Sequence, residues 1–195
     1  MYRNFVKRLF DIIISLIALP FIAVVGVPIA ALIKFEDSGT VFYVSKRYGK
    51  NMNKFNMIKF RSMKMNAGDI RNEDGTTFNS ENDERQTKIG RLLRKTSLDE
   101  LPQFINVLKG EMSIIGPRPS PIGNEATYTE TVKKKFSVRP GITGYNQVLL
   151  RNSASLEERY SNDVYYAENV GFFLDMRIFV MTIKSVFLRK NIYHS

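Results

Sequence analysis

A long uncharged segment near the N-terminus constrains this chain more than any other feature. Residues 12–33 contain no charged side chain, and as an α-helix they would extend about 33 Å at about 1.5 Å per residue. That length is enough to cross the hydrocarbon core of a bilayer. No small-residue cleavage site precedes the next polar region, so the pattern does not indicate a cleaved signal peptide. The segment therefore predicts membrane association.

Two prolines and two groups of cations argue against a simple crossing. Pro20 and Pro28 each remove a backbone donor and favour a kink. Cations lie on both sides of the segment: Arg3, Lys7 and Arg8 before it, and Lys34, Lys46, Arg47, Lys50 and Lys54 after it. A single crossing would send one group outward, against the positive-inside tendency. We therefore expect a re-entrant membrane-anchoring helix over residues 1–36, broken at Pro20 and Pro28; a proline-containing span is the alternative.

Composition narrows the chemistry that such a chain can perform. The formal net charge is +10, which indicates an anionic partner such as nucleic acid, acidic lipid or a phosphorylated substrate. There are no cysteines, so disulfides and thiolate metal sites are excluded. The single histidine, His194, stands next to the last residue, where a frayed tail is the commoner interpretation. An active site in this chain must therefore use carboxylates, cations, hydroxyls and a metal.

The adjacent carboxylates Asp99 and Glu100 are the strongest candidates for catalysis. Arg94 lies upstream and Arg118, inside Gly-Pro-Arg-Pro, lies downstream. A carboxylate pair among fixed cations suits Mg²⁺-assisted chemistry on a phosphate ester. The structural alternative is helix capping, either by a capping box from Ser97 to Glu100 or, with a better fit to Pro102, by Asp99 as N-cap. An N-cap position would keep Asp99 ionised, so capping and chemistry are compatible.

Further cations are candidates for binding phosphate, each with a structural alternative. Lys59 and Arg61 end an alternating segment, and their side chains are expected either on a solvated strand face or against a phosphate or headgroup. The prolines beside Arg118 fix its backbone, which suits bidentate phosphate recognition, although an exposed turn is equally compatible. Arg139 opens the motif Arg-Pro-Gly-Ile-Thr-Gly, whose glycines permit close approach to a ligand. Arg151 follows this motif.

The remaining periodicity predicts an α+β fold, mostly helical and irregular. Strands are expected over residues 41–44, 54–61 and 113–115, and helices over 87–96, 101–109, 125–135 and 156–166. Residues 172–190 form a last helix with an apolar stripe: Phe172, Met176, Phe179, Val180, Ile183, Val186 and Phe187. The stripe fits either core packing or an amphipathic helix at a membrane interface.

Several ordered motifs carry a resemblance to a known family. They are Lys7-Arg8-Leu9-Phe10-Asp11, Lys59-Phe60-Arg61-Ser62-Met63, Ser97 to Asn106 with Val107-Leu108-Lys109-Gly110, Gly116-Pro117-Arg118-Pro119, Arg139 to Gly144, and Asp163-Val164-Tyr165-Tyr166. Each is weak alone, but their order and spacing are specific. Over nearly its whole length the chain resembles the bacterial sugar transferases, small monotopic phosphoglycosyl transferases that initiate lipid-linked glycan assembly.

The resemblance implies a fold, a reaction and a location. It implies a re-entrant helix and a compact catalytic domain over residues 37–195, with interfacial amphipathic helices, on the cytoplasmic face of the bacterial inner membrane. Asp99 would be the nucleophile that takes a phospho-sugar from a UDP-sugar, releases UMP and passes the group to undecaprenyl phosphate. Glu100 would hold Mg²⁺ together with Asp99. Arg94, Arg118, Arg139 and Arg151 would stabilise phosphate charge. Anionic lipids, a second copy of the chain and other glycan-assembly enzymes are the partners that fit.

The sequence departs from the family pattern in the membrane helix and after the Arg139–Gly144 motif. The family usually has Ser-Pro at the helix break, where this chain has Leu19-Pro20 and Val27-Pro28. The family's usual Trp-Ala-Gln-Val-Asn-Gly is replaced by residues 145–150, so the sugar is not inferred from relatives.

One rival function is that of an inactive membrane scaffold with the same fold, which the intact carboxylate pair disfavours. A second is a membrane-tethered nucleic-acid-binding protein, which leaves Asp99 and Glu100 unexplained, so no nucleic-acid partner is expected. A third is a transferase that forms no covalent intermediate, with Asp99 as a metal ligand only.

Overall fold

The computed structural model describes residues 1–68, 70, 72, 78, 80, 82–150 and 153–188, with the backbone alone for residues 186–188. In this part of the chain the fold is α+β with many helices, as the sequence predicts. The helices are α1 (Lys7–Asp37), α2 (Lys88–Thr96), α3 (Gln103–Lys109), α4 (Glu130–Lys133), α5 (Tyr145–Leu149), α6 (Leu156–Glu168) and α7 (Phe172–Leu188). The strands are β1 (Phe42–Tyr48), β2 (Lys54–Phe60), β3 (Ser113–Ile115), β4 (Ser120–Pro121) and β5 (Gly141–Thr143). A π-helical turn, Tyr2–Val6, precedes α1, and short 3₁₀ turns lie at Lys50–Met52, Leu98–Glu100, Glu125–Thr127 and Lys134–Ser137.

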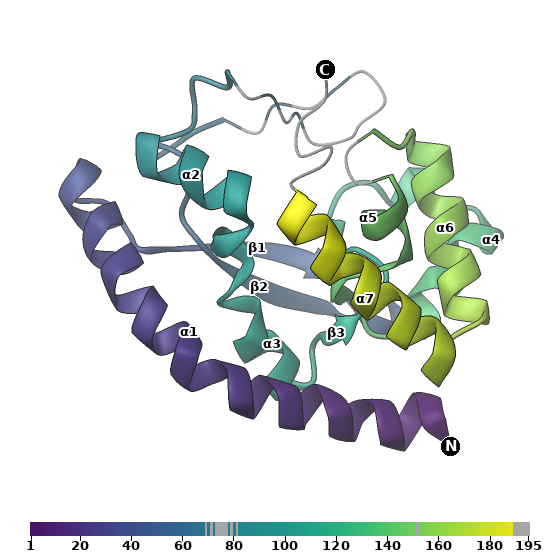
Figure 1. Cartoon of the computed structure of the whole chain (residues 1–195). Helices are drawn as coiled ribbons and strands as arrows, with labels where there is room; N and C mark the ends of the chain where they lie inside the picture. Colours follow the sequence, from purple (N-terminus) through teal and green to yellow (C-terminus); the bar gives the residue numbers. More distant parts are fainter. Residues whose placement is uncertain are drawn as a thin grey trace.

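The first helix is one continuous α-helix that passes through both prolines. Figure 1 shows it curving along one side of the molecule, past α3 and toward α2. With its preceding turn it spans residues 2–37 and is long and apolar enough to cross a membrane. Its buried residues are few, namely Asp11, Ser15, Ile29 and Ile33, and many of its apolar side chains are exposed. Membrane association therefore has a structural basis. The helix is not interrupted at Pro20 or Pro28, contrary to the expected break, and the re-entrant path stays a prediction.

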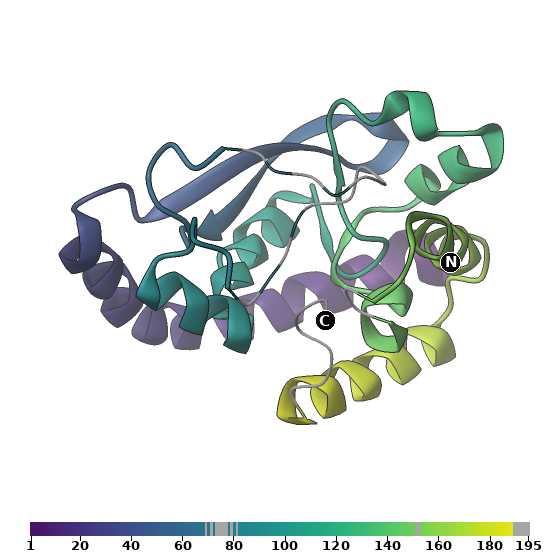
Figure 2. The same ribbon diagram turned by 90° about the horizontal axis from the view of Figure 1, so that it is seen from above.

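Two small sheets provide the strand component. In the larger sheet the strand order is β2-β1-β4 and all pairs are antiparallel; β1 and β2 pair from Phe42 with Phe60 to Tyr48 with Lys54. In the smaller sheet β3 and β5 are parallel. Figure 2 shows the β1–β2 ribbon on one side of the molecule and α7 on the other. The three strands expected from sequence are confirmed, and β1 continues to Tyr48.

The glycines of the Arg139–Gly144 motif serve packing between backbone segments. A Cβ on Gly141 would stand 2.1 Å from the backbone nitrogen of Gly116, and one on Gly144 would stand 2.0 Å from the Gly116 carbonyl oxygen. Only glycine permits this approach, which lets β5 pair with β3 and fixes the backbone just before Arg118. The expectation that these glycines approach a ligand is replaced by this role, because the neighbouring backbone occupies the space.

The main core lies between the strands and the helices α3, α6 and α7. Its buried residues include Val107, Met112, Tyr166 and Ile178, all nearly without exposed surface. A second cluster joins Ile29 and Ile33 of α1 to Phe60 and Leu93. The C-terminal half of α1 is thus packed on the same elements that carry the candidate catalytic residues.

The apolar stripe of α7 faces outward, so its interpretation as core is wrong. Phe172, Met176 and Ile183 are exposed, as are Phe179 and Val180, whereas the opposite face buries Asp175 and Ile178. The core is filled from that opposite face, which leaves the stripe free. An interfacial role for this helix stays a prediction, and the stripe now has the exposure that such a role needs.

Two expected helices begin or end differently from the prediction. The helix expected from Leu101 starts at Gln103, with Pro102 at its N-cap position, and ends at Gly110 as expected, where φ is 82°. The expected helix over residues 125–135 is divided into a 3₁₀ turn, the short α4 and a second 3₁₀ turn. The side chain of Thr129 starts α4 by accepting the N–H of Val132.

Candidate active site

Asp99 and Glu100 lie in the 3₁₀ turn Leu98–Glu100, between α2 and α3. Ser97, with φ at 58°, ends α2 and begins this turn. Neither capping hypothesis holds, since no side-chain cap bond forms at Ser97 and the N-cap position of α3 belongs to Pro102. Leu98 and Leu101 pack on the second core cluster. The two leucines thus anchor the turn, and the carboxylates between them are available for another role.

Glu100 is held by two cations from distant parts of the chain. Lys59 Nζ, from β2, donates a hydrogen bond to Glu100 Oε1 at 2.6 Å, and Arg118 Nη2 lies 3.5 Å from the same oxygen. Burial would raise the pKa of Glu100, but the charges of Lys59 and Arg118 outweigh it and lower this pKa to about 2. Glu100 is therefore ionised at any working pH.

Asp99 is buried and has a different electrostatic environment. Burial raises its pKa to about 6, with a further rise from the charge of Glu100, against the opposing charges of Lys59, Arg94 and Arg118. The described residues donate no side-chain hydrogen bond to its carboxylate. The expectation that a helix N-terminus keeps Asp99 ionised is thus replaced by a desolvated carboxylate that cations stabilise near neutral pH. An ionised, weakly hydrogen-bonded carboxylate of raised basicity is suited to nucleophilic attack.

Arg118 is positioned by a buried ion pair that sequence analysis missed. Lys135 Nζ and Asp163 Oδ2 are 2.6 Å apart, with side chains only 4% and 5% exposed. Asp163, in α6, is also stabilised by the backbone N–H of Arg118. Asp163 therefore fixes the backbone of the Gly-Pro-Arg-Pro segment, while the Arg118 side chain is half exposed. Asp163 stands in a recognised motif, but no local pattern pairs it with a lysine 28 residues earlier.

The structure brings together some of the predicted phosphate-binding residues and separates others. Lys59, Arg94 and Arg118 surround the carboxylate pair. Arg61 is buried and forms a bidentate ion pair with Asp37 at the end of α1, which is a structural contact. Arg139 donates from Nε to the Gly110 carbonyl and lines a different pocket. Arg151 lies outside the described residues.

The donor set fits a magnesium ion, although the described residues contain no cluster of three or more acidic or histidine side chains. Mg²⁺ is commonly held by one or two carboxylates together with substrate phosphates and water. Asp99 and Glu100 would supply the carboxylates, because the Lys59 and Arg118 contacts both engage Oε1 of Glu100. This arrangement leaves Oε2 and the Asp99 oxygens for other ligands.

The structure thus combines a helix long and apolar enough to cross a membrane with a buried carboxylate pair among cations. The chain belongs to the bacterial sugar transferase family, whose model matches residues 2–189. It is 38% identical over 186 residues to an uncharacterized sugar transferase, EpsL, of Bacillus subtilis, which covers 95% of this chain and 89% of that protein.

Two relatives whose names state an activity are matched over only a part of their own length. The UDP-N-acetylgalactosamine-undecaprenyl-phosphate N-acetylgalactosaminephosphotransferase of Aeromonas hydrophila is 36% identical over 93% of this chain and 44% of itself. The UDP-glucose:undecaprenyl-phosphate glucose-1-phosphate transferase of Klebsiella pneumoniae is 36% identical over 96% of this chain and 41% of itself. The present chain thus spans less than half of these two relatives.

Proposed function

We propose that this chain transfers a sugar 1-phosphate from a UDP-sugar to undecaprenyl phosphate through a covalent aspartyl intermediate. The observation that carries the proposal is the pairing of a buried Asp99 of raised pKa with a fully ionised Glu100, surrounded by Lys59, Arg94 and Arg118. Two relatives whose names state sugar-phosphate transfer to undecaprenyl phosphate support the same reaction class.

The reaction divides into two displacements at one phosphorus atom. An Asp99 carboxylate oxygen attacks the sugar-bearing phosphate, the bond to the UMP oxygen breaks, and UMP leaves with that electron pair. A phosphate oxygen of undecaprenyl phosphate then attacks the same phosphorus, and the Asp99 carboxylate departs unchanged. The product is a polyprenyl diphosphate sugar, and no other reactant is needed.

The surrounding residues fit separate tasks in this scheme. Asp99 is the better nucleophile of the pair, because the Glu100 oxygen is held by Lys59 and Arg118 and its pKa is low. Arg118 and Arg94, whose charges act on Asp99, would stabilise charge on the transferring phosphate. A magnesium ion bound by Asp99 and Glu100 would neutralise diphosphate charge.

A location on the cytoplasmic face of the bacterial inner membrane is part of the proposal. The exposed apolar surface of α1 and the outward stripe of α7 support contact with lipid at two places. Such contact would let a lipid-linked phosphate reach Asp99 while the UDP-sugar arrives from water.

Isotope exchange tests the covalent route directly. Purified full-length protein, Mg²⁺, a panel of UDP-sugars and labelled UMP are incubated without lipid acceptor, and label entering the UDP-sugar is measured. The proposal expects exchange with one or a few sugars, because only an enzyme-bound phospho-sugar can return to UMP. Lipid-dependent UMP release without exchange would show direct displacement and overturn Asp99 as nucleophile. No UMP release with any donor in the presence of lipid would favour an inactive scaffold.

A further inference from the structure

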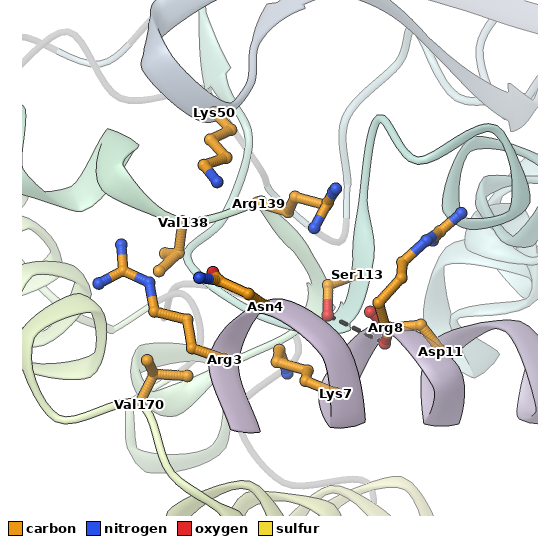
Figure 3. Close-up of a pocket in the computed structure, with 10 residues that line it drawn as sticks. All are labelled: Arg3, Asn4, Lys7, Arg8, Asp11, Lys50, Ser113, Val138, Arg139 and Val170. Atoms are coloured by element: carbon orange, nitrogen blue, oxygen red, sulfur yellow. Dashed lines mark hydrogen bonds between the residues drawn. The ribbon is translucent and has the colours of Figure 1, made fainter. Parts of the chain in front are cut away.

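A second cation-rich region lies away from the candidate active site, beside the N-terminal end of α1. This region, the N-terminal pocket, is lined by Arg3, Asn4 and Arg8 from the start of the chain, Lys50 from the β1–β2 turn, and Arg139 before β5. Figure 3 shows Lys50 directed toward this group from the opposite side. The pocket shares no lining residue with the group of Asp99, Glu100, Lys59, Arg94 and Arg118.

Carboxylates near the N-terminal pocket balance only a part of its charge. Lys7, which also lines it, forms an ion pair with the buried Asp175 at 2.7 Å. Asp11 lines it as well, and its Oδ1 accepts bonds from Ser113 Oγ and the backbone N–H of Ile114. Asp11 is thus committed to fixing β3 against α1, and four other cations in the pocket share this one carboxylate.

The hydrogen bonds of the arginines are made to neutral groups. Arg3 donates to the carbonyl of Ser137, Arg8 to the carbonyls of Val107 and Leu108, and Arg139 to that of Gly110. A carbonyl satisfies a guanidinium donor without cancelling its charge. Arg8 and Arg139 consequently repel each other.

Lys50 adds charge to the same place and has the least constrained side chain. Its ammonium makes no hydrogen bond or ion pair with the described residues, although it sits in a short 3₁₀ turn whose backbone is fixed by bonds at Gly49 and Asn53. A rigid turn that directs a lysine at two arginines costs electrostatic energy unless an anion is present.

We infer that the N-terminal pocket binds a phosphate group, with Lys50, Arg139 and Arg8 as its charge partners and Asn4 as a neutral donor. Guanidinium groups held by backbone contacts present planar N–H pairs that match phosphate oxygens. The pocket contains no carboxylate pair, so this site binds and performs no group transfer. It does not depend on the proposed function of Asp99.

The bound phosphate has two possible sources with the same chemistry, a phospholipid headgroup and a soluble phosphate. The exposed Phe5 and Leu9 lie on the other side of the helical segment that supplies Arg3 and Arg8. A helix with its apolar side in lipid would therefore bring the pocket close to headgroups.

Two binding measurements on the full-length protein separate these sources. In the first, detergent-purified protein is titrated with inorganic phosphate at constant ionic strength, and binding is followed by thermal stabilisation. In the second, binding to vesicles of phosphatidylcholine with and without phosphatidylglycerol is measured by flotation. The test variant is Lys50→Gln. The matched control is Lys46→Gln, which removes the same charge from an exposed position on the same hairpin.

The inference expects Lys50→Gln to weaken binding about fivefold, the value for loss of one cation near an anionic surface, with Lys46→Gln close to wild type. A selective loss in the phosphate titration identifies a soluble phosphate as ligand. A selective loss only with phosphatidylglycerol vesicles identifies a headgroup. Equal losses in both variants, or no saturable binding of either probe, would overturn the inference, because binding would then follow overall charge.

Discussion

Two cation-rich regions of this chain differ in the groups that oppose their charge. Around Asp99, the cations face a pair of adjacent carboxylates, and the pKa values of that pair are driven apart. In the N-terminal pocket, Arg3, Arg8 and Arg139 donate hydrogen bonds to backbone carbonyls instead. The first arrangement provides a nucleophile with stabilised charge, whereas the second leaves surplus positive charge that a ligand can satisfy. Net charge alone does not distinguish chemistry from binding.

Among the residues of the two regions, we expect substitution of the nucleophile Asp99 to reduce the reaction rate most. Asp99→Asn keeps the size of the side chain and removes the attacking charge, so we expect lipid-dependent UMP release to fall at least about 10³-fold. Initial rates of UMP formation with saturating donor measure the loss. Glu130→Gln is the control and should retain wild-type rates, because this exposed carboxylate pairs only with the exposed Lys133 among the described residues. Comparable rates in Asp99→Asn and Glu130→Gln would exclude Asp99 as nucleophile.

A smaller effect separates the cations of the two regions. Arg118→Gln is expected to reduce UMP release about 10²-fold, because a donor to the developing charge is lost. Lys50→Gln should reduce the same rate by less than about tenfold, since Lys50 does not contact the carboxylate pair. Both variants remove one surface cation, so each controls for net charge. Equal losses would mean that the N-terminal pocket takes part in the reaction.

Elements with strong local signals were predicted well from the sequence. The alternation of residues 54–61, the helical spacing of residues 87–96 and the glycine that follows residues 101–109 all act through neighbours in the chain. The structure has β2, α2 and α3 close to the expected positions. The prediction of one helix over residues 125–135 is wrong, because two 3₁₀ turns flank the four-residue helix α4 there.

Long-range contacts explain most of what the sequence could not provide. Arg61, Arg118 and Arg139 all stand in family motifs and were all candidates for phosphate binding. In the structure Arg61 pairs with Asp37, and Arg139 donates to the Gly110 carbonyl. The pairing of Lys135 with Asp163 depends on how α6 packs against the 3₁₀ turn Lys134–Ser137. Sequence identified Asp99 and Glu100 as candidates, but the difference between their pKa values depends on burial and on Lys59 from another element.

The pH dependence of the reaction sharpens the contrast between the two carboxylates. Since the pKa of Asp99 is raised to about 6, the nucleophile becomes protonated below that pH. We expect UMP release to fall about tenfold per pH unit below about 6 and to level off above pH 7. Glu100→Gln should move the midpoint to lower pH, because the Glu100 charge raises the pKa of Asp99. Rates that stay constant from pH 8 to about pH 5 would contradict this assignment.

The smallest effect concerns stability, and it tests whether the burial of Asp99 has a cost. A folded-state pKa raised from 3.8 to about 6 means that the ionised carboxylate destabilises the fold above that range. Asp99→Asn should therefore increase the free energy of unfolding by about 1–2 kcal/mol near pH 8. This gain should shrink as the pH falls from 6 toward 4, where wild-type Asp99 becomes protonated in the folded state. Thermal unfolding of both proteins in detergent at several pH values measures the difference, with Glu130→Gln as control. A variant that is less stable than wild type near pH 8 would show that Lys59, Arg94 and Arg118 outweigh desolvation, and Asp99 would then resemble Glu100.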